Sequence, residues 1–212
     1  MESLFIKICG VTNADDALCA AESGADAIGF NFYPSSKRFI DPDQVNEICE
    51  ALDMPIFRVG VFVNPARDYV ETAIKKAALN AIQFSGNEIP GDVSGYGRKV
   101  FKAIHISGVE SLAAMNLYNV EAFLLDTYRD GDYGGTGETF DWDVARKAKQ
   151  FGKVILAGGL TPKNVSAAVR LVRPYGVDVS SGVEVRPGVK DHKKIKDFIR
   201  RAREEHGRVQ GI

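Results

Sequence analysis

The sequence is poor in cysteine, contains no long apolar run and carries almost no excess charge. Its three cysteines, Cys9, Cys19 and Cys49, are an odd number without C-x-x-C spacing. This argues against disulfides and structural zinc and favours a reducing cytoplasm. No apolar run approaches the ~18 residues of a membrane span, and we expect no signal peptide, because the chain passes almost directly into an apolar segment. With 27 basic against 28 acidic residues and no basic block, a nucleic-acid partner is not indicated either.

What the chain does contain is a regular alternation of apolar and helical segments. Strands are expected within 4–12 (broken at Gly10), 26–32, 56–63, 80–84, 99–106, 120–126, 153–157 and 176–180. Helices are expected at 13–22, 41–52, from 64, weakly near Pro90, at 108–116, 141–152, from 161 and at 191–205. Strict alternation demands a parallel sheet, and eight such units predict an α/β fold, a single-domain (β/α)₈ TIM barrel spanning 1–212. An open doubly wound sheet is the alternative, but no G-x-G-x-x-G follows the first strand.

In such a barrel the active site lies at the carboxyl ends of the strands. Lys7 and Cys9 share one face of the first strand, because strand side chains alternate. One interpretation is a small buried thiol beside a lysine that extends to solvent. The other is a reactive thiol. Asp178 lies on the last strand, which adjoins the first when the barrel closes, so a Lys7–Asp178 pair in the lumen would keep Lys7 charged beside Cys9.

Two glycine-rich loops suggest a phosphate site. Gly159 follows the seventh strand, and Ser180, Ser181 and Gly182 follow the eighth. Barrels often hold phosphate between these two loops, with backbone N–H groups and a short extra helix, for which 181–184 has the right length. Two ordinary turns would use the same residue types. We favour the phosphate site because both loops lie on the correct edge.

Other strand ends supply isolated polar side chains. Asp126 ends an apolar strand, where a carboxyl group of raised pKa can donate a proton, although a loop-anchoring role is equally compatible with the spacing. Arg38 follows the second strand and suits a bidentate grip on a carboxylate or phosphate, or else is solvated. Gln83 and His105 end the fourth and fifth strands. No strand-end set of His, Asp and Glu side chains has the character of a metal site, so no metal is expected.

Short motifs recur along nearly the whole chain: KICGVT at 7–12, GADAIGF at 24–30, SSKR at 35–38, VGVFVN at 59–64, LDT at 125–127, GGTG at 134–137 with FDW at 140–142, LAGGL at 156–160 and VDVSSGVE at 177–184. In order, spacing and identity these motifs resemble those of the phosphoribosylanthranilate isomerase family of tryptophan biosynthesis. The resemblance implies an Amadori rearrangement, in which N-(5-phosphoribosyl)anthranilate becomes 1-(2-carboxyphenylamino)-1-deoxyribulose 5-phosphate. It implies no cofactor.

The resemblance also implies roles for particular residues. Asp126 would be the general acid, Cys9 the general base, and Arg38 the contact for the anthranilate carboxylate. The phosphate would be held by Gly159, Ser180, Ser181 and Gly182. Apart from the resemblance, we expect Lys7, Gln83 and Asp178 to support the site because of their places on the strands. One departure stands out: the family commonly has Gln-Leu-His-Gly after strand four, whereas this chain has Gln83-Phe84-Ser85-Gly86. The histidine's contribution would fall to Ser85 or His105, or be absent.

Two other functions are compatible with a phosphate-binding barrel. An aldose–ketose isomerase that uses two aspartates would end its first strand in Asp, where this chain has Cys9. A non-catalytic sensor would have no need of both Cys9 and Asp126. The expected partner is a small-molecule substrate, and monomer and homodimer both remain open.

Overall fold

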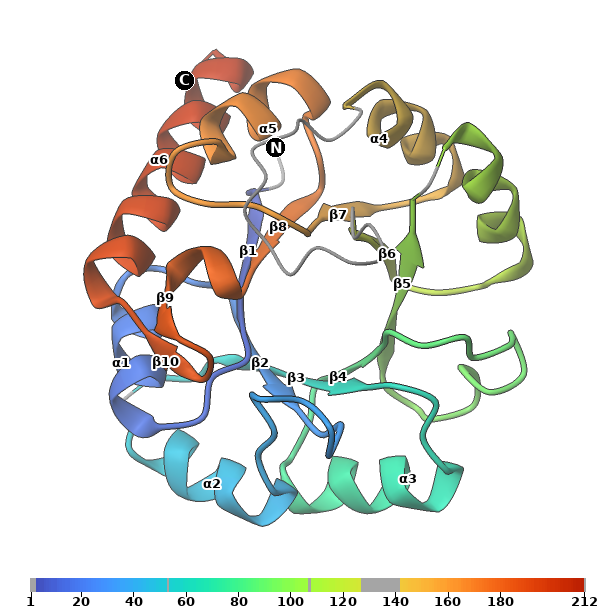
Figure 1. Ribbon diagram of the computed structural model, residues 1–212, viewed down its shortest axis with the longest axis vertical. Coiled ribbons are helices and arrows are strands. Elements are labelled where there is room, and N and C mark those ends of the chain that lie inside the picture. The colour runs from blue at the N-terminus through green and yellow to red at the C-terminus, as the bar shows by residue number, and fades with distance from the viewer. Residues whose placement is uncertain (1–2, 53, 107, 127–141, 212) are drawn as a thin grey trace.

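The computed structural model describes residues 3–52, 54–106, 108–126 and 142–211, and its eight barrel strands close into a ring (Figure 1). These are β1 (Phe5–Cys9), β2 (Ala27–Asn31), β3 (Phe57–Phe62), β4 (Ala81–Phe84), β5 (Lys99–His105), β6 (Ala122–Asp126), β7 (Val154–Leu156) and β8 (Gly176–Val179). Each strand pairs in parallel with the next, and β8 pairs in parallel with β1. The closed ring confirms the predicted barrel, and the open-sheet alternative is wrong.

The helices surround the ring of strands (Figure 1). They are α1 (Ala14–Glu22), α2 (Pro42–Glu50), α3 (Arg67–Lys76), α4 (Trp142–Ala148), α5 (Val165–Val172) and α6 (His192–Gln210), with 3₁₀ segments η1 (Val109–Leu117), η2 (Lys149–Phe151) and η3 (Ser181–Val183). Asn13, Asp41 and Asp191 cap α1, α2 and α6 by accepting backbone N–H groups. Among the described residues, no helix is long and apolar enough to cross a membrane.

The expected helix near Pro90 is wrong. The segment between β4 and β5 contains Gly91, Gly95 and Gly97 as well as the proline, and these residues disfavour a helix. Its turns are held instead by Glu88, which accepts the backbone N–H groups of Asn64 and Gly86 and pairs with Lys102 on β5.

Smaller differences concern helix type and helix starts. The segment expected to be helical at 108–116 is the 3₁₀ segment η1, and α3 and α5 begin at Arg67 and Val165, a few residues beyond their prolines. After η3 the chain forms an unpredicted antiparallel hairpin, β9 (Glu184–Arg186) and β10 (Val189–Lys190).

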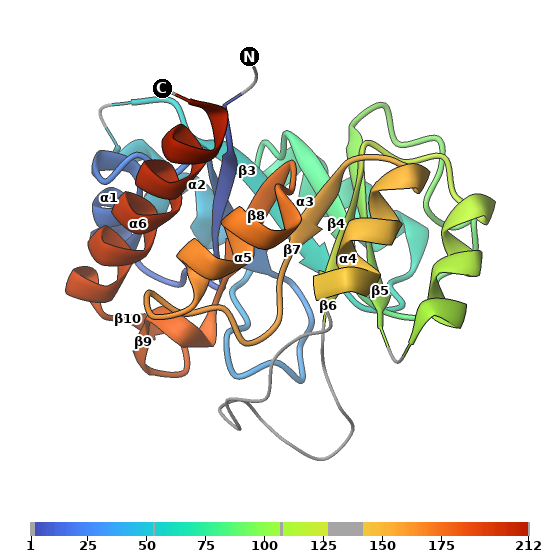
Figure 2. The same ribbon diagram turned by 90° about the horizontal axis from the view of Figure 1, so that it is seen from above.

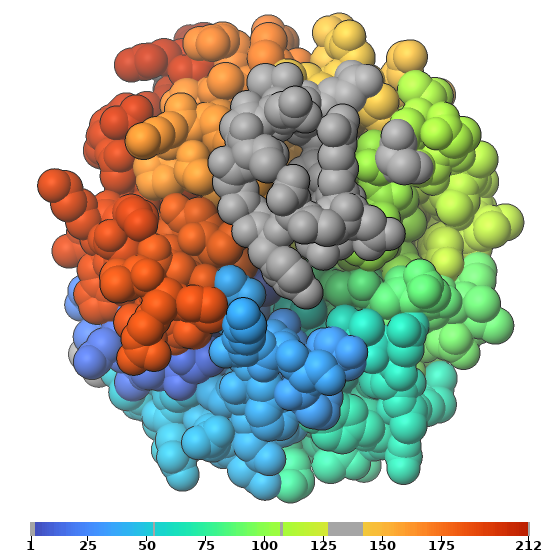
Figure 3. All heavy atoms as spheres, in the orientation of Figure 1, coloured from blue at the N-terminus to red at the C-terminus, as the bar shows by residue number. Residues whose placement is uncertain are grey.

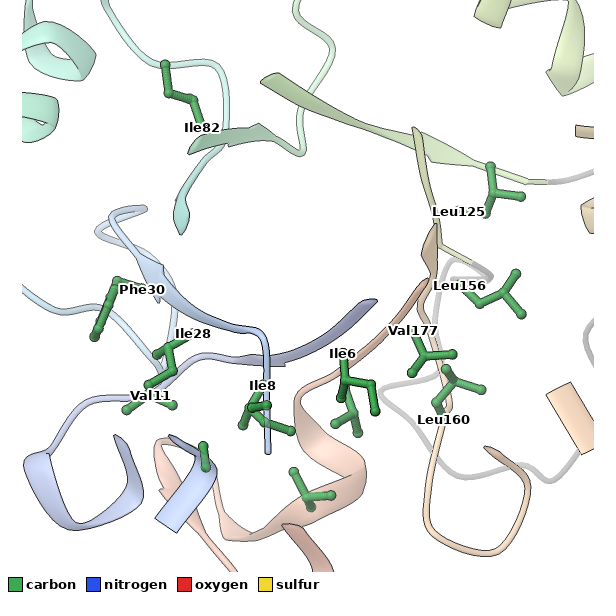
Figure 4. Close-up of a cluster of buried hydrophobic side chains, with 14 of the residues drawn as sticks. Ile6, Ile8, Val11, Ile28, Phe30, Ile82, Leu125, Leu156, Leu160 and Val177 are labelled. Atoms are coloured by element: carbon green, nitrogen blue, oxygen red, sulfur yellow. The ribbon is translucent and has the colours of Figure 1, made fainter. Parts of the chain in front are cut away.

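Two apolar layers hold the barrel together. The outer layer lies between strands and helices, where Ile6, Ile8, Ile28, Leu125 and Val177 point away from the ring (Figure 4). A smaller inner layer fills the lumen with Ala27, Val59, Ala81, Phe101, Ala103, Ala122, Leu124, Ile155 and Ala157. Phe5, Phe57 and Tyr175 pack on this inner layer, and the Phe5 and Tyr175 rings stack at 5.8 Å. These rings lie at the amino ends of the strands, so the polar groups of the lumen lie toward the carboxyl ends.

The two ends of the barrel differ in what they carry. Figure 2 shows both chain termini at one end and the β9–β10 hairpin at the other. On the face seen in Figure 3, the C-terminal segment, coloured orange to red, directly adjoins the N-terminal quarter of the chain, coloured blue. Because the N-terminus leads into the amino end of β1, the opposite end, where the hairpin lies, is that of the carboxyl ends of the strands. The candidate site is found there.

Candidate active site

Lys7 and Asp178 form an ion pair inside the barrel, where β1 adjoins β8. The strand register places the two residues opposite one another, and Lys7 Nζ donates to Asp178 Oδ1 at 2.7 Å. The Lys7 side chain is fully buried and that of Asp178 is 9% exposed. Burial opposes the ammonium charge, but the nearby Asp178 and Cys9 outweigh it, and the pKa of Lys7 is raised above its ordinary value. The predicted pair is therefore present, and the alternative in which Lys7 extends to solvent is wrong.

Cys9 ends β1 on the same face as Lys7, and its side chain is buried. Burial raises the pKa of the Cys9 thiol above its ordinary value, although the ammonium groups of Lys7 and Lys190 pull it down. Gly29 on β2 leaves room for this arrangement, because a Cβ there would lie 2.9 Å from Cys9 Sγ and 3.0 Å from Lys7 Cε. Lys7 thus lowers the pKa of the thiol, as expected, but desolvation raises this pKa by more.

The two candidate phosphate loops touch each other at the barrel mouth. Gly158 and Gly159 after β7 have φ angles of 68° and 64°, in the left-handed region that favours glycine. Among the residues that the structure describes, a Cβ at Gly159 would meet nothing within 4 Å, so this backbone borders open space there. Gly182 packs so tightly on the neighbouring loop that a Cβ would lie 1.9 Å from the Leu160 carbonyl oxygen. The predicted short helix is present as η3 (Ser181–Val183), and its glycine is what allows the loops to meet.

Arg38 forms a bidentate ion pair with Glu184 across the mouth. Arg38 Nε and Nη2 donate to the two Glu184 oxygens at 2.8 and 2.7 Å. Burial acts to raise the pKa of Glu184, but Arg38 and Lys190 outweigh it and hold the pKa below its usual value. Gly10, with φ 71°, lies beneath the arginine, because a Cβ there would be 2.5 Å from Arg38 Cδ. The Glu184 carboxylate therefore already orients Arg38, the arginine predicted to bind substrate. The sequence analysis gave Glu184 no role of its own.

Lys190, on β10, is a site residue that sequence reasoning missed. Its side chain is fully buried, and its ammonium group donates to the carbonyl of Cys9 at 2.5 Å, to Glu184 Oε1 at 2.9 Å and to the carbonyl of Ser180 at 3.3 Å. It thus connects the end of β1, the loop after β8 and the Arg38–Glu184 pair. The hairpin that carries Lys190 was not predicted. The sequence pattern therefore did not distinguish Lys190 from the solvent-exposed basic residues that follow it on the last helix.

Asp126 ends β6 on the lumen side and is half-buried. Ala122 and Leu124, on the same face, belong to the inner apolar layer, as predicted from parity. In the strand register the Cα of Asp126 is paired with that of His105 on β5, whose side chain is exposed. The histidine and the predicted general acid therefore start from neighbouring positions at the mouth. The motifs of the loop after Asp126, at 127–141, lie outside the described residues.

Gln83 lies buried on the lumen face of β4. Its Nε2 donates to Ser85 Oγ at 3.0 Å, whereas its Oε1 has no hydrogen-bond partner in the part of the chain that the structure describes. Leaving a buried amide oxygen unpaired costs on the order of 1–3 kcal/mol. An unpaired acceptor near the barrel mouth is therefore suited to accept a hydrogen bond from a ligand. The amide nitrogen of Gln83 is occupied by Ser85.

Together these groups define a class of protein: a (β/α)₈-type barrel whose candidate active site lies at the carboxyl ends of its strands and contains a thiol, a carboxyl group and buried cations. Across the described ranges no group of three or more His, Cys, Asp or Glu side chains is arranged to hold a metal ion. The lumen charges are instead provided by Lys7, Asp178, Glu184 and Lys190.

Comparison with known proteins identifies the family. The family model of N-(5'-phosphoribosyl)anthranilate isomerase matches residues 6–201. The isomerase of Geotalea uraniireducens is 48% identical over 198 residues, covering 93% of this chain and 98% of the relative. The crystal structure of the Thermotoga maritima isomerase superposes with a TM-score of 0.88 at 42% identity, covering 95% of this chain and 99% of that one. Another solved isomerase, at 40% identity and a TM-score of 0.83 over 95% and 99% of the two chains, is in complex with reduced 1-(o-carboxyphenylamino)-1-deoxyribulose 5-phosphate.

The chain belongs to the N-(5'-phosphoribosyl)anthranilate isomerase family. It is therefore an isomerase of tryptophan biosynthesis, as the sequence motifs implied.

Proposed function

We propose that this chain converts N-(5-phosphoribosyl)anthranilate to 1-(2-carboxyphenylamino)-1-deoxyribulose 5-phosphate with Cys9 and Asp126 as its catalytic pair. The observation that carries this proposal is the placement of a buried thiol and a half-buried carboxyl group at the mouth of one barrel, on strands β1 and β6. An acid and a base that act on different atoms of one sugar must approach it from different sides, and these two strands are three positions apart in the ring of eight.

The proposed reaction begins with protonation of the ribose ring oxygen by Asp126. The bond between this oxygen and C1 breaks, and the anthranilate nitrogen supplies the electron pair that forms a protonated Schiff base. Cys9, as thiolate, then removes the proton from C2 and leaves an enolamine, which tautomerises to the ketone. The role of base requires the thiolate, and the buried Lys7 and Lys190 favour it against the cost of desolvation.

The substrate's two anionic ends fit the cations and loops of the mouth. We assign the phosphate to the loops that carry Gly159, Ser180, Ser181 and Gly182, because the backbone at Gly159 borders open space and η3 is held against the neighbouring loop. We assign the anthranilate carboxylate to Arg38, which uses Nε and Nη2 to bind Glu184 and carries a further NH₂ group. Gln83 would accept from the substrate through its Oε1.

The test is the decay of fluorescence of freshly prepared phosphoribosylanthranilate. A general acid or base is worth about 10²–10⁴-fold, so Cys9→Ala and Asp126→Asn should each lose at least about a hundredfold in kcat. Cys49→Ala is the matched control, since Cys49 is a buried thiol on helix α2, away from the barrel lumen. Turnover at wild-type level in either catalytic variant would overturn the role assigned to that residue.

We also propose that residues 1–212 form one domain that works in the cytoplasm as a monomer or homodimer. The Thermotoga maritima relative is described as dimeric, with monomers generated from it. A molar mass measured in solution, near 23.1 kDa or twice that value, distinguishes the two assembly states of this chain.

A further inference from the structure

Lys190 lies at a junction of four segments of the chain. Its ammonium group contacts the main chain of Cys9, the main chain of Ser180 and the carboxylate of Glu184, and Glu184 in turn holds Arg38. One side chain therefore touches the segment that carries the proposed base, the loop assigned to the phosphate and the partner of the arginine assigned to the carboxylate. No other lysine in the described ranges has this combination of partners.

The backbone of Lys190 is held as firmly as its side chain. Its N–H donates to Asp16 Oδ2 at 2.9 Å, and the same carboxylate accepts from Asn13 Nδ2 and contacts His192 Nε2 at 2.9 Å. Beside it, Thr12 Oγ1 donates to the Gly188 carbonyl at 2.6 Å. The hairpin is thus pinned to the segment that follows β1, which fixes the point from which Lys190 reaches inward.

In the described part of the chain, the five charged side chains grouped around Cys9 do not balance one another. Lys7 pairs with Asp178, whereas Arg38 and Lys190 share the single carboxylate of Glu184. These five groups contain three cations and two anions, so one positive charge is left for an anion that is not part of this set. The thiolate of Cys9 and an anionic substrate are the two anions that the proposed reaction brings there.

We propose that Lys190 is a positioning residue of the isomerase, which holds the end of β1, the loop after β8 and, through Glu184, Arg38 in the arrangement that the reaction needs. This inference rests on the proposed function, and it adds a role for Lys190 and Glu184 that neither the motifs nor the reaction chemistry assigns. Lys190 does not itself touch a reacting atom; it acts through its three acceptors.

The charge pattern gives a test that does not depend on turnover: the alkylation rate of Cys9 by iodoacetamide between pH 6 and 10, followed by mass spectrometry of the Cys9 peptide. Lys190→Met removes a cation and should slow the alkylation of Cys9 at pH 8 by about three- to tenfold. Glu184→Gln removes an anion, leaves Arg38 and Lys190 uncompensated and should speed it. Opposite shifts are the expected signature, because loosened packing would move both variants in the same direction.

Lys102→Met is the matched control, because Lys102 is also a buried lysine paired with a buried carboxylate, Glu88, at 3.1 Å, but on β5. It should lower the melting temperature to a similar degree and leave Cys9 alkylation unchanged. Equal shifts in Lys190→Met and Lys102→Met, or same-direction shifts in Lys190→Met and Glu184→Gln, would overturn the proposal. If Lys190→Met does not fold, Glu184→Gln decides alone, and an unchanged alkylation rate in it refutes the proposal.

Steady-state kinetics supply the second readout. A displacement of about 1 Å in a positioned group costs roughly 10²-fold, so Lys190→Met should lose about ten- to a hundredfold in kcat/KM, with a raised KM as well as a lowered kcat. A loss of activity that is explained entirely by a smaller amount of folded enzyme, with an unchanged KM, contradicts a positioning role. Failure of the wild-type protein to turn over the substrate would refute the proposed function itself and would leave the alkylation result to be judged separately.

Discussion

The buried Lys7–Asp178 pair makes a quantitative prediction about stability. In Asp178→Asn the amide can still accept a hydrogen bond from Lys7, but the negative charge is lost and a fully buried ammonium remains. At 2.7 Å and an effective dielectric constant near 20, the lost attraction is about 6 kcal/mol. The penalty is capped at about 5 kcal/mol, because at pH 7 a lysine with an ordinary pKa near 10.4 can lose its proton at about 1.4 kcal/mol per pH unit.

We therefore expect Asp178→Asn to reduce the free energy of unfolding by about 3–5 kcal/mol, which agrees with the usual cost of breaking a buried pair. For a protein of this size that corresponds to a melting temperature lower by roughly 6–20 °C. The double variant Lys7→Met with Asp178→Asn should recover most of this loss, because no buried charge is left without a partner.

The assay is urea unfolding followed by circular dichroism, with the slope of free energy against urea checked for constancy. Asp43→Asn is the matched control, since Lys76 and Asp43 are also 2.7 Å apart but have side chains that are 46% and 63% exposed. Its effect should be small and sensitive to salt. An Asp178→Asn variant no less stable than the Asp43→Asn control would refute the prediction that burial makes the Lys7–Asp178 pair contribute more to the free energy of unfolding than an exposed pair.

Three further predictions concern the mouth of the barrel. Gly182→Ala places a methyl group against the Leu160 carbonyl and should raise KM about tenfold, since the loops after β7 and β8 must separate. Gly91→Ala is the control: no described residue lies within 4 Å of the added methyl group, so KM should be unchanged. Gln83→Leu removes the unpaired buried oxygen and should raise the free energy of unfolding by about 1 kcal/mol while lowering kcat/KM; a less stable variant contradicts this. The lowered pKa of Glu184 contributes stability above its ordinary pKa near 4.5, and this contribution is lost as the pH falls through the lowered value. Glu184→Gln should therefore show a shallower fall in melting temperature below pH 4.5, and parallel curves refute this.

Most of the fold follows from patterns that repeat along the chain. The buried strands are short apolar runs, and Asn13 and Asp41 mark helix starts through their capping chemistry, so eight units could be counted. Closure of the ring then makes first and last strands neighbours, and side-chain parity places Lys7 opposite Asp178. These predictions succeed because each depends on period and connectivity alone.

The parts that could not be predicted lack a periodic signal. The strands β9 and β10 have three and two residues, too few to show alternation, so the position of Lys190 was not visible. The pKa of Cys9 depends on how completely its surroundings exclude water, and this is a property of the packed barrel rather than of the neighbouring Lys7. The orphaned oxygen of Gln83 likewise depends on which groups fail to reach it, which only the three-dimensional arrangement shows.

The pairing of β1 with β8 means that the candidate site forms only after most of the chain has been synthesised. Lys7 and Asp178 are 171 residues apart in the chain, and Lys190 reaches back 181 residues to Cys9. During synthesis Lys7 and Cys9 leave the ribosome long before Asp178 and Lys190, which pair with Lys7 and with the Cys9 main chain. A partly made chain therefore contains the proposed base without these partners, and the appearance of activity reports that the barrel has closed.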